Sequence, residues 1–80
     1  MTEDTVLTTV IAAVREVVPE AEVSADTLLI ARKIIDSLSL LSLVSLLEKD
    51  LSITIRDAEV LPANFETPLA IRAFLKTKGL

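Results

Sequence analysis

The segment from Ser37 to Asp50 constrains the fold more than any other part of the chain. Its apolar side chains recur every three or four residues, the spacing of one face of an α-helix. Asp36 precedes this run and suits an N-cap, because its carboxylate can accept a hydrogen bond from a first-turn N–H. The side chains expected to face the core are Leu40, Leu43, Val44, Leu47 and Leu51. The sequence therefore predicts an amphipathic helix that begins at Ser37.

The outward side of this predicted helix is unusually apolar. Leu38, Leu41 and Leu46 fall there, between serines and Lys49. Either a neighbouring segment covers these leucines, or part of the face is a docking surface for another protein. The sequence leaves both alternatives open.

A first helix is expected over residues 3–18, because its apolar side chains also recur at helical spacing. Those on the inner face are Val6, Val10, Ala13, Val14 and Val17. Thr2 is the expected N-cap, and Pro19 ends the helix because it lacks an N–H and its ring clashes with the preceding turn. No period holds from Pro19 to Ile35, so we expect a long loop there, whose apolar residues pack back on the helices.

Thr67 followed by Pro68 predicts the start of a last helix, since Thr suits the N-cap and proline the first helical position. This helix is expected to run to about Lys76. A short helix is expected at about residues 57–61. The predicted fold class is all-α: residues 1–80 form a single domain, a four-helix bundle of three longer helices, one short helix and a long first loop.

The residue types that are absent narrow the possible functions. The chain contains no Cys and no His, which removes the thiol nucleophile, the commonest general base and the commonest metal ligands. A minimal enzyme could use only Glu48 or Asp50 as a base, and both are expected on an open helix where nothing would perturb their pKa. We therefore expect a protein that is not an enzyme and has no metal site.

Charge and hydropathy narrow the partners. The net charge of −4 argues against nucleic acid or an anionic membrane as partner. The longest uncharged stretch, Ser37 to Leu47, is shorter than the roughly 20 apolar residues that cross a bilayer. The acidic start after Met1 lacks the basic flank of a signal peptide. The expected protein is soluble, cytoplasmic, monomeric and free-standing.

One serine stands apart by its position. Ser37 follows an N-cap acid, opens the clearest helix and closes the long loop. The first N–H groups of a helix lack internal partners and carry partial positive charge. A phosphate ester on Ser37 would be stabilised by these amides, and the hydroxyl would lie at a corner that another protein can reach.

Taken together, these features resemble the acyl and peptidyl carrier proteins over essentially the whole chain. The hallmark of that family is Asp-Ser-Leu at the start of the second helix, matched here by Asp36, Ser37 and Leu38. The resemblance implies that Ser37 receives 4′-phosphopantetheine from coenzyme A, added by a magnesium-dependent phosphopantetheinyl transferase, and that Asp36 assists this transferase. The terminal thiol would then carry an acyl or aminoacyl group as a thioester, from an activating enzyme to downstream acyl-transfer enzymes.

Two details bear on the kind of carrier. The run Phe65-Glu66-Thr67-Pro68 is more similar to aminoacyl and D-alanyl carriers than to fatty-acid carriers. Family members often place glycine two residues before the Asp, where this chain has Ile34, so the loop must turn differently. The sequence does not identify the cargo or the pathway.

Partner recognition is also expected to differ from that of fatty-acid carriers, whose second helix is acidic. Here the acids of that helix, Glu48 and Asp50, lie near its far end. The residues expected to contact partners are Leu38, Leu41, Ser42 and Ser45. The main alternative is a helical interaction module without a cofactor, which would use the same leucines but give Ser37 no role.

Overall fold

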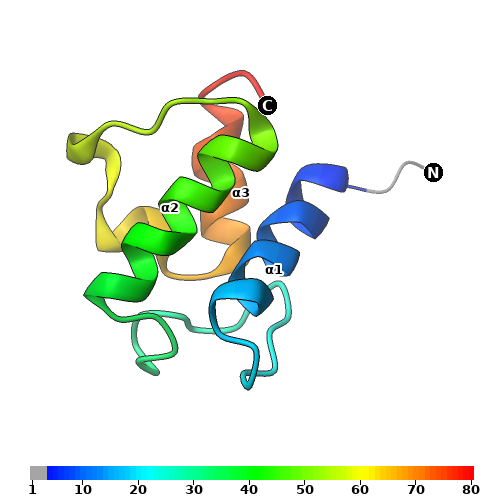
Figure 1. Cartoon of the computed structure of the whole chain (residues 1–80). Helices are drawn as coiled ribbons and strands as arrows, with labels where there is room; N and C mark the ends of the chain where they lie inside the picture. The colour runs from blue at the N-terminus through cyan, green and yellow to red at the C-terminus, as the bar shows by residue number, and fades with distance from the viewer. Residues whose placement is uncertain (1–3) are drawn as a thin grey trace.

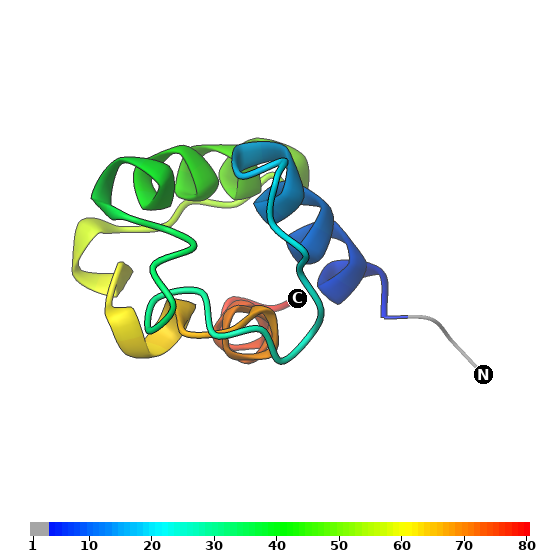
Figure 2. The ribbon, with the colours of Figure 1, turned by 90° about the horizontal axis from the view of Figure 1, so that it is seen from below.

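The computed structural model describes residues 4–80, which form an all-helical fold without any β-strand. Its three α-helices are α1 (Thr5–Val17), α2 (Ser37–Leu51) and α3 (Pro68–Lys76). Figure 1 shows α2 in front of α3, with α1 beside them. The loop between α1 and α2 closes one end of the molecule and is seen from below in Figure 2. The all-α class predicted from the sequence is confirmed.

Helix α1 begins two residues later than predicted. Its N-cap is Asp4, whose Oδ1 accepts a hydrogen bond from the backbone N–H of Leu7 at 3.1 Å. The expected cap, Thr2, lies outside the described residues. The helix ends at Val17, just before Pro19, as predicted. Its fully buried residues are Val10, Ala13 and Val14.

Helix α2 matches its prediction closely. It begins at Ser37 and ends at Leu51, where Ser52 takes a left-handed conformation with φ 55° and donates its N–H to the carbonyl of Glu48. The residues of α2 buried in the core are Leu43, Val44 and Leu47. Leu40 and Leu51, also predicted for the core, are only partly buried and pack against its edge.

Helix α3 also begins and ends as predicted. The Thr67 hydroxyl accepts a hydrogen bond from the N–H of Ala70 at 3.0 Å, and Pro68 occupies the first helical position. The helix buries Pro68, Ile71, Phe74 and Leu75. Its Arg72 Nε lies 3.0 Å from both carboxylate oxygens of Asp4, so α3 is joined to the start of α1 by an ion pair.

The short helix expected at residues 57–61 is not found, and a four-helix bundle is not confirmed. The segment instead forms two 3₁₀ turns, Asp57–Glu59 and Pro62–Phe65. The first is closed by Glu59, whose Oε1 accepts from the N–H of Arg56 at 2.9 Å. Pro62 cannot donate an N–H, so helical hydrogen bonding cannot run through this position. The chain turns there and brings Phe65 into the core, fully buried.

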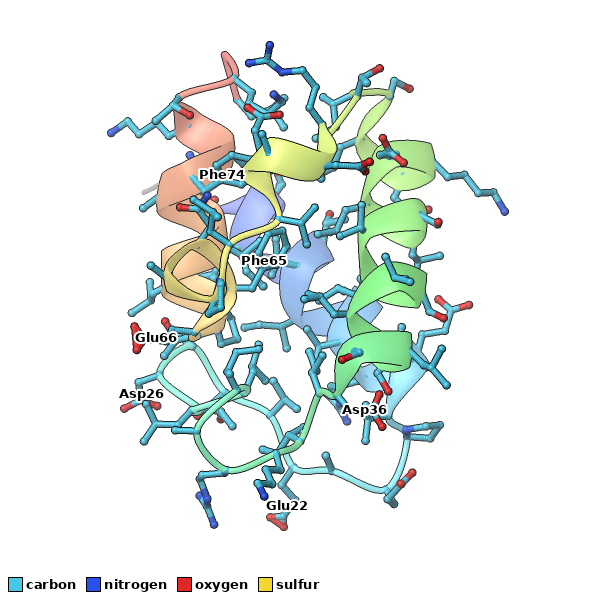
Figure 3. All side chains as sticks on the ribbon, turned by 90° about the vertical axis from the view of Figure 1, so that its left-hand side faces the viewer. Glu22, Asp26, Asp36, Phe65, Glu66 and Phe74 are labelled. Atoms are coloured by element: carbon cyan, nitrogen blue, oxygen red, sulfur yellow. The ribbon has the colours of Figure 1, made fainter. Side chains whose placement is uncertain are left out.

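The loop from Pro19 to Ile35, called the strap from here on, packs back on the helices as expected. Leu29 and Ile35 are buried in the same core as the three helices. The N–H of Leu29 donates to the carbonyl of Glu66 at 2.8 Å, which fastens the strap beside the start of α3. Figure 3 shows this end of the molecule at the bottom of the view, with Phe65 and Phe74 in the interior above it.

Candidate functional site

Ser37 is the first residue of α2 and is exposed to solvent. No side-chain hydrogen bond described for residues 4–80 engages its hydroxyl, which is therefore open to solvent. The N–H groups of Ser37 and Leu38 belong to the first turn and have no carbonyl partner inside the helix. The hydroxyl therefore lies at a helix start where a phosphate group would meet N–H donors and the positive end of the helix dipole.

Asp36 is the N-cap of α2, as predicted. Its Oδ1 accepts from the backbone N–H of Ser39 at 2.8 Å, and its carbonyl accepts from the N–H of Leu40 at 2.8 Å. The hydrogen bond from the Ser39 backbone is the main cause that lowers the pKa of Asp36 below its ordinary 3.8, and the Ser39 side chain adds to it. The residue before Ser37 is therefore an ionised, exposed carboxylate with a fixed orientation (Figure 3).

The strap reaches Asp36 through a turn at Lys33. Lys33 has a φ of 56°, a left-handed conformation that costs a residue with a Cβ about 1–2 kcal/mol. The N–H groups of Ile34 and Ile35 both point to the carbonyl of Leu29, at 2.9 and 3.1 Å. The turn thus falls at Lys33. This is one residue before Ile34, which stands where carrier proteins often have glycine. Ile35 is buried directly after it and anchors the approach to Ser37.

The structure separates the outward leucines of α2 into covered and uncovered ones. Leu46 is partly buried and packs against the core. Leu38 and Leu41 keep 78% and 60% of their surface exposed. The covering alternative is therefore confirmed for Leu46, whereas no segment within residues 4–80 covers Leu38 and Leu41. The uncovered leucines are the two nearest to Ser37.

Ser42 and Ser45, also expected to contact partners, are exposed and line an open hollow of about 510 Å³ between α1 and α2. The complete lining is Glu16, Val17, Ser42, Ser45, Leu46 and Lys49. The expected partner-contact residues thus divide into two groups, since Leu38 and Leu41 lie outside this hollow. The sequence did not predict that Glu16 and Val17 line this hollow. Their position depends on how α1 packs on α2, for which the chain carries no local signal.

The two carboxylates considered as possible bases do not form a site. Glu48 Oε2 accepts from the backbone N–H of Ile55 at 2.8 Å and so holds the chain that follows α2. Asp50 is exposed near the end of the helix. Among residues 4–80 no three acidic side chains lie close enough to hold a metal ion.

No helix within residues 4–80 combines the length and apolar character needed to cross a bilayer. Comparison of the chain with models of known protein families, with curated proteins and with solved structures gives no match.

Proposed function

We propose that this chain is a carrier protein whose Ser37 holds a 4′-phosphopantetheine arm. The observation that carries the proposal is an exposed serine hydroxyl, free of internal hydrogen bonds, that opens α2 directly after an ionised N-cap carboxylate. A serine used only to stabilise the helix start would use its hydroxyl as a cap. Here Asp36 does that, and the Ser37 hydroxyl is left for another use.

The surroundings of Ser37 suit attachment by a separate enzyme. The strap is held in place by buried Leu29 and Ile35, so a phosphopantetheinyl transferase can approach the corner without unfolding the domain. The phosphodiester formed on Ser37 would lie at the positive end of α2, where first-turn amides stabilise a phosphate. In the proposal, Asp36 assists the transferase through its charge.

The arm would carry an acyl or aminoacyl group as a thioester on its terminal thiol. A tethered intermediate is delivered at high effective concentration to any enzyme that docks the domain. The reactive chemistry belongs to the cofactor and to the partner enzymes: an activating enzyme that loads the thiol and acyl-transfer enzymes that unload it. In this function the domain is a monomeric, cytoplasmic carrier that catalyses nothing itself.

We also propose that the fold is a four-helix carrier bundle in which the segment 57–65 replaces the short helix. Its two 3₁₀ turns would carry the chain from α2 to α3, as that helix would. Buried Phe65 supports this, because it fixes the segment to the core despite its lack of α-helix.

A second function, a cofactor-free interaction module, is favoured by one observation: the exposure of Leu38 and Leu41 on α2. An apolar helix face of this kind can contact a partner directly. This alternative makes no use of the free Ser37 hydroxyl, so modification of that hydroxyl separates the two.

The experiment is incubation of the purified chain with coenzyme A, Mg²⁺ and a broad-specificity phosphopantetheinyl transferase, followed by intact-mass measurement. We expect a gain of one phosphopantetheine group, with none in the Ser37→Ala variant. Ser42→Ala is the matched control, since it removes another exposed hydroxyl of α2 and should be modified like the wild type. Absence of any mass gain, or a gain that persists in Ser37→Ala, would refute the assignment.

A further inference from the structure

The hollow between α1 and α2 combines hydrogen-bonding side chains of opposite kinds. Glu16 on α1 has a carboxylate that can only accept hydrogen bonds, and Lys49 on α2 has an ammonium that can only donate them. The hydroxyls of Ser42 and Ser45 can do both. All four residues are exposed, and none of the ion pairs within residues 4–80 involves Glu16 or Lys49. These polar groups are therefore available to a ligand.

The charges and the apolar side chains of the hollow indicate which kind of ligand fits it. One carboxylate and one ammonium sum to no net charge, which favours a neutral ligand over an anion or a cation. Amide groups match the polar lining, because an amide N–H can donate to a carboxylate and an amide carbonyl can accept from an ammonium or a hydroxyl. Val17 and Leu46, partly buried in the same lining, can contact methylene groups. The hollow therefore fits a neutral chain that contains amides.

The hollow also lies within reach of a chain attached to Ser37. Ser42 and Ser45 follow Ser37 on α2, about 8 and 12 Å further along the helix axis. A 4′-phosphopantetheine arm has about fourteen bonds from the Ser37 oxygen to its sulfur, the length of roughly five residues of extended chain or 16 Å. Beyond its phosphate the arm is uncharged and contains amides. The arm therefore has both the length and the chemistry that the hollow requires.

We infer that the hollow between α1 and α2 is a binding site for the pantetheine part of the arm, whose amides lie between Glu16 and Lys49. The inference rests on the proposed attachment of the arm to Ser37 and adds a second place at which the domain holds it. Each contact is exposed to water and weak by itself. The chain is tethered, however, so its effective concentration at the hollow is high. A partner enzyme that takes the thioester must draw the arm out of this site.

The site can be tested without the transferase, because the chain contains no cysteine. The variant Ser37→Cys has a single thiol, to which a synthetic chain can be coupled through a maleimide group. One probe is a neutral chain of pantetheine length that contains amides. Its counterpart is an ether chain of the same length, which has no N–H donor. The backbone amide resonances in a ¹H–¹⁵N NMR spectrum report where each chain lies on the domain.

Matched variants separate the hollow from the rest of the surface. We expect the amide chain to shift the resonances of Val17, Ser42 and Ser45 several-fold more than the ether chain does. Glu16→Ala should reduce these shifts, because it removes the acceptor for the amide N–H groups. Glu20→Ala removes an exposed carboxylate from the strap and should leave the shifts unchanged. Each shift is measured against the same variant without a coupled chain.

Equal shifts with the two chains would overturn the inference, as would shifts of the amide chain that fall outside the hollow. A Glu16→Ala variant that responds like Glu20→Ala would overturn it as well. The chemical coupling keeps this test separate from the proposed function. If the amide chain binds in the hollow but the transferase leaves Ser37 unmodified, only the carrier function is refuted. If the transferase modifies Ser37 but the amide chain does not bind in the hollow, only the binding site is refuted.

Discussion

Arg72 in α3 and Asp4 at the start of α1 are joined by two hydrogen bonds of 3.0 Å, from the guanidinium Nε to each carboxylate oxygen. The two residues are 68 positions apart in the chain. Asp4 also accepts the N–H of Leu7, so one carboxylate both caps a helix and ties it to another. The hydrogen bond from the Leu7 backbone is the largest cause of the lowered pKa of Asp4, and Arg72 is the second.

We therefore expect the stability contributed by Asp4 to depend on pH. Because its pKa is lower in the folded than in the unfolded chain, the contribution is complete above the ordinary value of 3.8 and is lost as the pH falls through the folded value. Asp4→Asn keeps a capping side chain but loses the charge, so its melting temperature should lie below that of the wild type at neutral pH and approach it in strong acid. Asp50→Asn, with one carboxylate fewer elsewhere, should show no such convergence.

Replacements of Asp36 should separate its two roles. Asparagine caps a helix nearly as well as aspartate, whereas alanine does not. Asp36→Asn should therefore keep the melting temperature of the wild type, and Asp36→Ala should lower it. If the charge assists the transferase, both variants should be modified by phosphopantetheine more slowly than the wild type, as followed by intact mass over time. If phosphopantetheine is attached to Asp36→Asn as fast as to the wild type, the Asp36 carboxylate has no role beyond capping the helix.

Phe65 is predicted to fix the segment 57–65 to the core. Its ring is fully buried and lies 5.9 Å from that of Phe74, centroid to centroid. Phe65→Ala should lower the free energy of unfolding by about 3–5 kcal/mol, because it removes a large buried side chain and leaves a cavity. Leu69→Ala, at a half-exposed position of α3, should change it by far less. Urea denaturation of both variants measures the difference, and similar losses would show that Phe65 has no special place in the core.

Lys33 offers a test of the turn that leads to Ser37. Glycine adopts the left-handed conformation of Lys33 without steric cost, although it also makes the unfolded chain more flexible. Lys33→Gly should therefore raise the free energy of unfolding, by up to about 1 kcal/mol. Arg32→Gly, one position earlier and without a positive φ, should lower it. A loss of stability in both variants would mean that the Lys33 side chain contributes more than its backbone strain costs.

The parts of the fold that the sequence predicts well are those set by neighbours in the chain. Asp36 and Thr67 cap their helices through N–H groups three residues away, so a short stretch of sequence contains all the information. The start of α1 shows the limit. Thr2 and Asp4 are both good caps, and the observed cap, Asp4, is also held by distant Arg72.

The same limit applies to the segment after α2 and to the candidate site. The short helix expected at residues 57–61 is replaced by turns whose residues are held by distant parts of the chain: Phe65 is buried in the core, and Glu59 pairs with Lys78. Leu41 and Leu46 are alike in sequence, yet only Leu46 packs against the core. The position of Ser37 at a helix start could be predicted, whereas the hollow lined by Ser42 and Ser45 depends on how α1 packs on α2.

The position of Ser37 within the molecule also determines how the protein can be immobilised with Ser37 accessible. Helix α2 rises by about 22 Å along its length, and the chain after α3 lies at the end of the molecule away from Asp36 (Figure 3). A linker added after Leu80 would thus leave from the far pole. A chain coupled by such a linker to a sensor chip or resin would present Ser37 and the exposed leucines of α2 to the mobile phase, so that loading enzymes can be screened on a uniformly oriented layer.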